Sequence, residues 1–158
     1  MSKKRNRGRA IEISAGLSLL LLSACGLGGA ELRGSDGKLQ ACDGGPHCVS
    51  SLSRDPEHHI EPFHYSGKRE EARQALLRVL RNTPDAEVVT ESPDYIHVEF
   101  TSPLMRYVDD VEFTLPSAEN IIQVRSSSRI GYTDFGANRE RIERLRLAFF
   151  QLYPSIYR

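Results

Sequence analysis

Polar side chains that could bind a ligand are concentrated between residues 106 and 139. On one strand-like run, Arg125 and Arg129 alternate with serines, and the turn after it leads into a helix that starts near Asn138. A helix N-terminus offers free N–H groups, and together with guanidinium and hydroxyl groups it can hold a phosphate or a carboxylate. The candidate residues for such a small-anion site, or for a structural polar cluster, are Arg106, Asp109, Asp110, Arg125, Ser126, Ser128, Arg129, Asp134, Asn138 and Arg139.

The same residues also have a structural explanation. Arginines and carboxylates on neighbouring strands can pair across a sheet, and the serines would then be small residues beneath a helix. The members of such a salt-bridge lattice are Arg106, Arg125, Arg129, Glu99, Asp109, Asp110 and Glu112. We favour this lattice over the small-anion site, and we rank catalysis third.

Catalysis has the weakest support in the sequence. No serine lies in a nucleophile elbow, and no histidine has an obvious carboxylate partner at short range. Asp109 and Asp110 are adjacent, so on a regular strand they point to opposite faces and cannot act as a carboxylate pair. We therefore predict no catalytic residue, no cofactor and no metal. We favour a non-catalytic protein over an enzyme, and an unrecognised hydrolase is the remaining alternative.

Asp109 breaks the alternation of apolar and polar residues in its strand. The parity of Val111 and Phe113 puts Asp109 on the buried face, where a lone carboxylate is costly. One explanation is a β-bulge at Asp109 and Asp110, and the other is a buried cationic partner, for which Arg106, Arg125 and Arg129 are the candidates. We favour the bulge.

The chain begins with the pattern of a signal peptide. Five basic residues precede an apolar run over 13–22, which is too short to span a bilayer and is followed by small residues. The sequence Leu22-Ser-Ala-Cys25 resembles the lipobox of bacterial lipoproteins. This resemblance implies cleavage after residue 24 and a diacylglyceryl group on Cys25, and acyl chains such as palmitate would then anchor the protein to a membrane.

Cleavage and export would change the net charge of the chain and the partners that it can meet. Removal of residues 1–24 leaves 16 basic and 20 acidic residues, a net charge of about −4, which argues against nucleic-acid binding. Residue 26 is Gly rather than Asp, which by resemblance favours the outer membrane, with the domain facing the periplasm. We expect the membrane as one partner, through the lipid anchor, and an envelope protein or a small anion as another.

Two cysteines remain besides Cys25. Cys42 and Cys48 are separated by turn-forming residues, and two thiols so close together outside the cytoplasm usually form a disulfide. Their spacing is not the C-x-x-C of thiol oxidoreductases. A metal site that uses both sulfurs with His47, His58, His59 or His64 has no spacing typical of a known zinc motif. We predict the disulfide.

The pattern of apolar residues predicts one domain of the α+β class. Residues 1–24 form the signal peptide, residues 25–45 a flexible tether and residues 46–158 the domain. Helical spacing predicts helices over 68–82 and 138–153, and alternation predicts strands over 60–63, 86–90, 95–101, 105–115 and 121–130. The expected fold is an antiparallel β-meander of about four to five strands, with both helices packed on one face.

Four motifs, in this order, resemble a known family. They are Cys48-Val-Ser-Ser51, Arg106-Tyr-Val-Asp-Asp-Val-Glu-Phe113, Arg125-Ser-Ser-Ser-Arg129 and Gly131-Tyr-Thr-Asp-Phe-Gly-Ala-Asn-Arg139. Together they resemble the family catalogued as domain of unknown function 1499, over roughly residues 42–153. In this family another cysteine precedes the first motif, and Cys42 matches it. The resemblance implies one compact domain and no established substrate, cofactor or reaction.

Overall fold

The structure, a computed structural model, describes residues 32–34, 36–42, 44–130 and 134–153. The predicted signal peptide, Cys25 and the Gly131-Tyr-Thr part of the last motif lie outside these residues. The elements in chain order are β1 (Cys48–Ser50), β2 (Phe63–His64), α1 (Arg69–Arg81), β3 (Ala86–Glu91), β4 (Tyr95–Thr101), β5 (Val108–Thr114), β6 (Ile121–Ser128) and α2 (Ala137–Leu152).

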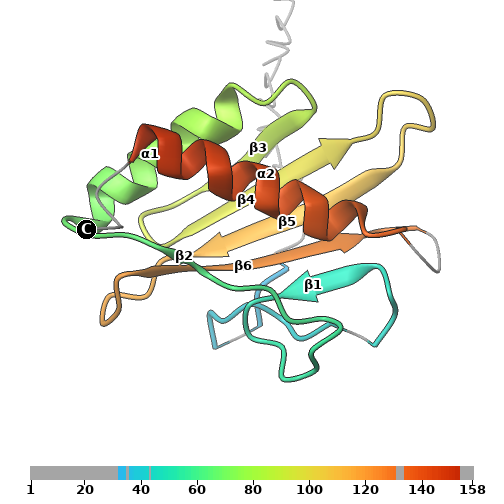
Figure 1. Ribbon diagram of the computed structural model, residues 1–158, viewed down its shortest axis with the longest axis horizontal. Coiled ribbons are helices and arrows are strands. Elements are labelled where there is room, and N and C mark those ends of the chain that lie inside the picture. Colours follow the sequence, from blue (N-terminus) through green and yellow to red (C-terminus); the bar gives the residue numbers. More distant parts are fainter. Residues whose placement is uncertain (1–31, 35, 43, 131–133, 154–158) are drawn as a thin grey trace, which may run out of the picture.

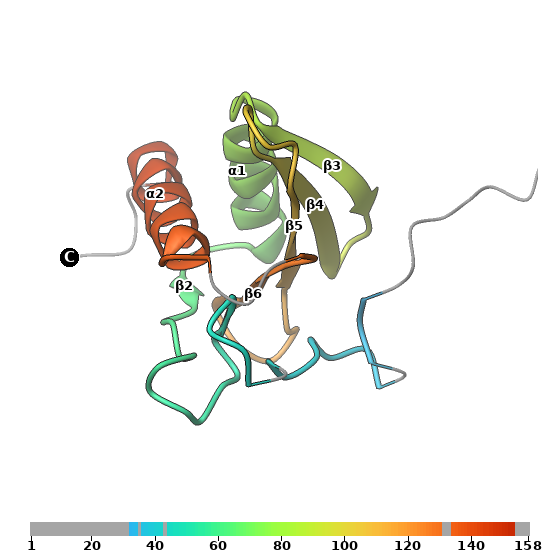
Figure 2. The same ribbon diagram turned by 90° about the vertical axis from the view of Figure 1, so that its right-hand side faces the viewer.

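The strands form one antiparallel sheet in the order β1-β6-β5-β4-β3, and β2 pairs with β6 outside this path. Strands β3 to β6 are a meander, because each pairs with the next one in the chain. Helices α1 and α2 both cover the same face of the sheet (Figure 1; Figure 2). The α+β prediction is therefore confirmed, and the predicted helices and meander strands lie within a few residues of the observed ones.

The core lies between the two helices and this face of the sheet. Every second residue of each central strand points into it, as the alternation predicts. In β4, β5 and β6 these buried residues are Ile96, Val98, Phe100, Val111, Phe113, Ile122 and Val124. The ring of Phe63 in β2 packs against Phe113 and Phe149, with centroids 5.9 and 5.7 Å apart, and so joins the sheet to α2.

The opposite face of the sheet is covered in part by the chain that precedes β1. The guanidinium of Arg33 lies 4.1 Å from the ring centroid of Tyr95, and Leu39 is buried. Some residues of the 25–45 stretch are thus in contact with the domain. Beside them lies a shallow cavity of about 350 Å³, and its lining includes Leu39 and Leu115.

Helix α2 holds the long connection between β1 and α1 through side chains seven residues apart. Arg139 donates to the carbonyls of Glu57 and His59, Arg146 to those of Glu61 and Pro62, and the Tyr153 hydroxyl to that of Ser66. Seven residues are two helical turns, so the three side chains project in one row along the helix. The connection follows this row in the same direction, and the row provides partners for its carbonyls.

Candidate functional site

The predicted polar cluster is divided between the two faces of the sheet. Neighbouring residues of a strand point to opposite faces, so Arg125 and Arg129 lie on the face away from the helices, and Ser126 and Ser128 lie beneath α2. Hydrogen bonds confirm this division, because Ser126 contacts Asn138 of α2, whereas Arg125 contacts Glu112. The residues therefore form separate clusters, which we describe in turn.

The first cluster surrounds Asp110 on the face away from the helices. The Asp110 carboxylate accepts a hydrogen bond from His97 Nε2 at 2.7 Å and two from Arg129, at 2.7 and 2.8 Å. Arg129 also pairs with Glu99. Asp110 and His97 are buried and Arg129 is partly exposed. Here the salt-bridge lattice forms as predicted, joining β4, β5 and the end of β6.

This environment lowers the pKa of Asp110. Burial would raise the pKa of the carboxyl, but the hydrogen bonds from His97 and Arg129 outweigh it and lower the pKa from 3.8 to about 2. Because the folded-state pKa is below the unfolded value, the interaction stabilises the fold above pH 3.8 and its contribution is lost as the pH falls toward 2.

We expect Asp110→Asn to lose about 2 kcal/mol of stability at neutral pH, the free energy that matches the pKa shift. Urea unfolding followed by circular dichroism across the acid range measures this loss. The difference between the wild type and the variant should shrink as the pH falls from about 4 to about 2. A difference that stays constant over this range would contradict the assignment.

His97, Glu99 and Asp110 also meet the distance requirement of a metal site. Each offers one ligand atom, and these atoms all lie within 4.8 Å of one another. An imidazole and two carboxylates are suitable ligands for a divalent ion. In the structure, the guanidinium of Arg129 contacts the carboxylates of Glu99 and Asp110. It supplies the positive charge that a metal ion would provide.

The second cluster, on the same face, surrounds Glu112. Its side chain is fully buried, and it accepts a hydrogen bond from the Tyr95 hydroxyl at 2.9 Å and one from Arg125 at 3.2 Å. Burial, and then the charge of Glu112, raise the pKa of Tyr95, so the phenol stays protonated and donates. The Arg125 Nε is buried and has no hydrogen-bond partner among the described residues. Glu112 was predicted as a lattice carboxylate, and its complete burial was not expected.

The third cluster lies beneath α2 and corrects the prediction for Asp109. The pairing of β5 with β4 and β6 continues without a shift through Asp109 and Asp110, so the predicted bulge there is wrong. The register shift in this sheet lies in β3, between Val88 and Thr90. Asp109 instead has a cationic partner, Arg141 of α2, which is none of the three arginines proposed.

Arg141 connects this cluster to the rest of α2. It donates to the Asn138 side-chain oxygen and, at 3.2 Å, to Ser126, and its guanidinium lies 4.9 Å from the ring centroid of Phe100. Asn138, which is fully buried, donates in turn to Ser128 at 3.1 Å and to the backbone carbonyl of His47 at 2.9 Å. The cluster thus links α2, β5, β6 and the residue before β1.

Arg141 is absent from the predicted cluster, although its position in the sequence indicates that it is buried. Residue 141 lies three positions after Asn138 and four before Leu145, which is the spacing of the buried stripe of this helix. A charged residue at such a position needs a partner on the opposing surface. Asp109, the carboxylate on the buried face of the sheet, is the partner that this pattern would have indicated.

The N-terminus of α2 is occupied by groups of the protein itself. Asp134, two residues before the N-cap residue Gly136, accepts hydrogen bonds from the backbone N–H groups of Gly136 and Asn138, at 3.0 and 2.9 Å. Burial would raise the pKa of Asp134, but these N–H groups outweigh it and lower the pKa. The two terminal nitrogens of Arg139, Nη1 and Nη2, donate to the backbone carbonyls of His59 and Glu57.

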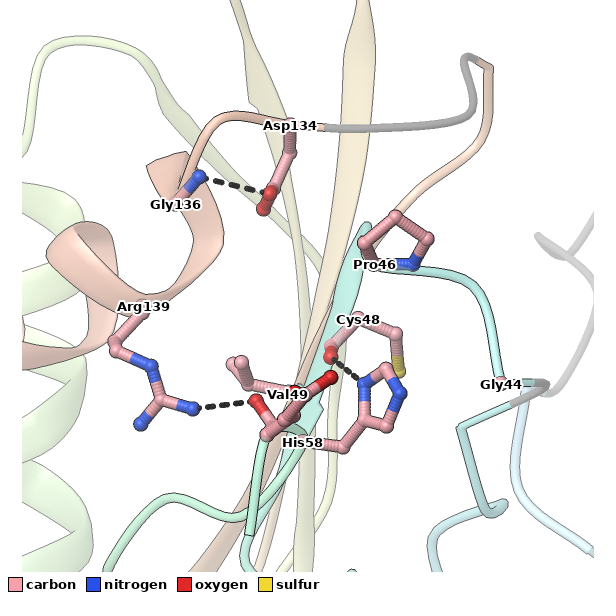
Figure 3. Close-up of a pocket in the computed structure, with 9 residues that line it drawn as sticks. Gly44, Pro46, Cys48, Val49, His58, Asp134, Gly136 and Arg139 are labelled. Atoms are coloured by element: carbon pink, nitrogen blue, oxygen red, sulfur yellow. Dashed lines mark hydrogen bonds between the residues drawn. The ribbon is translucent and has the colours of Figure 1, made fainter. Parts of the chain in front are cut away.

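A cavity of about 300 Å³ lies beside this helix end, and it is lined in part by Cys48, His58, Asp134 and Arg139 (Figure 3). The N–H groups and the guanidinium that would hold an anion already have partners inside the protein. Arg125 and Arg129 lie on the other face of the sheet. The predicted members of the anion site are therefore not brought together.

Arg106 is separate from all three clusters. It lies in the exposed turn between β4 and β5, with a positive φ of 57°, and it has no ion pair with any described residue. It is therefore not a member of the lattice that the sequence predicted.

The Cys42–Cys48 disulfide is present, with the two Cα atoms 5.6 Å apart, and this prediction is confirmed. It ties the segment before β1 to the edge of the sheet. His58 lies next to it, with Nδ1 at 2.9 Å from the carbonyl oxygen of Cys48. Because both sulfurs are in the disulfide, they are not thiolate ligands of a metal.

The fold and its clusters define a small α+β domain in which Asp109, Asp110 and Glu112 each pair with an arginine of the same chain. The chain belongs to the family described as Protein of unknown function (DUF1499), whose model matches residues 38–149. This match confirms the family resemblance. A search of curated proteins found no match for the chain. Among the residues described, no helix is long and apolar enough to cross a membrane.

Proposed function

We propose that this protein is an exported lipoprotein whose domain has a non-catalytic role, binding a partner or assisting an assembly at the cell envelope. Cys25 would carry the lipid, and the domain would face the periplasm from the outer membrane. One observation is the main support for a non-catalytic role. The polar residues with the greatest capacity for chemistry, Asp110, Glu112 and Asp109, are each paired with an arginine inside the domain.

Two further observations support the export of the chain. The lipobox-like sequence ends at Cys25, and a disulfide joins Cys42 to Cys48. Disulfides persist in oxidising compartments and are rare in the cytosol. The small-anion alternative has less support, because Arg125, Arg129 and Arg139 have partners within the protein. Native mass spectrometry of the delipidated protein distinguishes the two, since a retained small molecule would favour the alternative.

We expect Cys25→Ser to release the protein from membranes and to abolish its labelling by a fatty-acid analogue, because the thiol that accepts the diacylglyceryl group is absent. The measurement is membrane fractionation combined with labelling in the cell. Ser23→Ala is the matched control, since it keeps a small residue before Cys25 and should be labelled normally. Equal labelling and membrane association of Cys25→Ser and the wild type would contradict the anchor.

A further inference from the structure

Five large apolar side chains project into solvent from two loops at one end of the sheet. Leu104, Met105 and Tyr107 lie in the turn between β4 and β5, and Ile130 and Phe135 flank the connection from β6 to α2. The exposed fraction is 87% for Leu104 and 92% for Phe135. We call these five residues the apolar tip. The turn between β4 and β5 and the end of β6 lie on the right-hand side of Figure 1, the side that faces the viewer in Figure 2.

The two loops are joined through the strands that carry them. The backbone N–H of Arg129 donates to the carbonyl of Val108 at 3.2 Å, directly beside Tyr107 and Ile130. Within the first loop, Ser102 donates from its backbone N–H to the carbonyl of Tyr107 at 2.8 Å. The sheet therefore fixes the position of Ile130 relative to the first loop.

The backbone of the apolar tip is also unusual. Among the described residues, Arg106 and Phe135 are the two that are not glycine and have a positive φ, 57° and 53°. Residues with a Cβ atom rarely adopt this conformation, and such strain is concentrated at functional sites. Both strained positions lie in these loops, and the loops present their apolar residues to solvent rather than to the core.

Projecting aliphatic and aromatic side chains next to an arginine are typical of a surface that inserts into a membrane interface. The arginine here is Arg106, which is exposed and has no ion pair with any described residue. Its charge complements the phosphate of a lipid headgroup. We propose that the apolar tip inserts into the headgroup region of the membrane that holds the Cys25 anchor, an inference that rests on the proposed function.

The length of the chain allows this contact. Cys25 and Leu32, the first described residue, are seven residues apart, so they span at most about 25 Å. Arg33 then contacts Tyr95 at the beginning of β4, and the apolar tip begins just beyond the other end of this strand. The chain between Cys25 and Leu32 must therefore run back along about 20 Å, the length of β4, which its reach of about 25 Å allows. An anchor of this reach keeps the apolar tip close to the bilayer, which favours a lipid surface as its occupant over a protein.

The absence of tryptophan from the chain gives a direct test, because one introduced tryptophan is the sole indole. We would introduce Leu104→Trp and Phe135→Trp separately into the lipidated protein and reconstitute each into vesicles of equal parts phosphatidylethanolamine and phosphatidylglycerol with brominated acyl chains. The matched control is Leu147→Trp, which is exposed on α2. This control lies about 15 Å along the helix from its N-terminal end.

We expect bromine to quench the indoles of Leu104→Trp and Phe135→Trp on the order of threefold more strongly than the control, with a blue-shifted emission, since interfacial side chains lie about 5–10 Å below the headgroup surface. Unchanged thermal unfolding verifies the fold of each variant. If the protein floats with the vesicles but its indole is quenched no more than that of the control, the insertion of the apolar tip is wrong and the lipid anchor at Cys25 still stands. Protein that does not float at all would overturn both.

Discussion

Replacing Arg141 with methionine will lower the free energy of unfolding by about 3–5 kcal/mol, the usual cost of removing one partner of a buried ion pair. The change leaves Asp109 beneath α2 without its cation, and Asn138 and Ser126 lose a donor. Methionine retains most of the apolar volume, so the loss reports mainly on the unpaired charge. Urea unfolding at neutral pH, followed by circular dichroism, is the measurement.

Two controls make this experiment specific. Arg144→Met changes an exposed arginine of the same helix and should alter the stability by no more than about 0.5 kcal/mol. The double variant Arg141→Met/Asp109→Asn removes the unpaired charge and should recover much of the loss. If Arg141→Met were as stable as Arg144→Met, the buried pair would not hold α2 to the sheet.

Arg125→Met will lower the free energy of unfolding by about 3 kcal/mol, because it leaves the fully buried carboxylate of Glu112 with Tyr95 as its remaining partner in the cluster. This expectation separates a structural role from a ligand-binding one. A structural arginine affects folding directly, whereas a ligand-binding arginine can be removed from the free protein at little cost.

The double-mutant cycle with Glu112→Gln tests this role of Arg125. If the two residues form a pair, the double variant should be more stable than the sum of the single changes implies, with a coupling energy of about 1–3 kcal/mol. Additive effects, together with an unchanged melting temperature for Arg125→Met, would contradict the structural role and would favour the small-anion site.

The elements of the fold could be predicted because simple periodicities determine them. Ile96, Val98 and Phe100 alternate with polar residues and form a strand with one face in the core. The stripe of Ile142, Leu145 and Phe149 is buried as expected for a helix on that face. These patterns depend on neighbours in the chain, so a single sequence contains them.

The candidate site was harder to predict because it depends on contacts between distant segments. Alternation separates Arg125 and Arg129 from Ser126 and Ser128, yet their proximity in the chain suggested that they converge. The partner of Asp109 lies 32 residues away on another element, and position along the helix was the sole signal for it. The burial of Tyr95 and His97 on the nominally polar face was also missed, because alternation does not show whether another segment covers a face.

We propose that cleavage before Cys25 and acylation of this residue place the domain at the envelope. The most direct test is the intact mass of the protein purified from its host, with sequencing of its N-terminal peptide. We expect a chain that lacks residues 1–24, carries a diacylglyceryl group on Cys25 and contains the Cys42–Cys48 disulfide. A chain that still begins at Met1, with all three cysteines reduced and unmodified, would contradict this proposal.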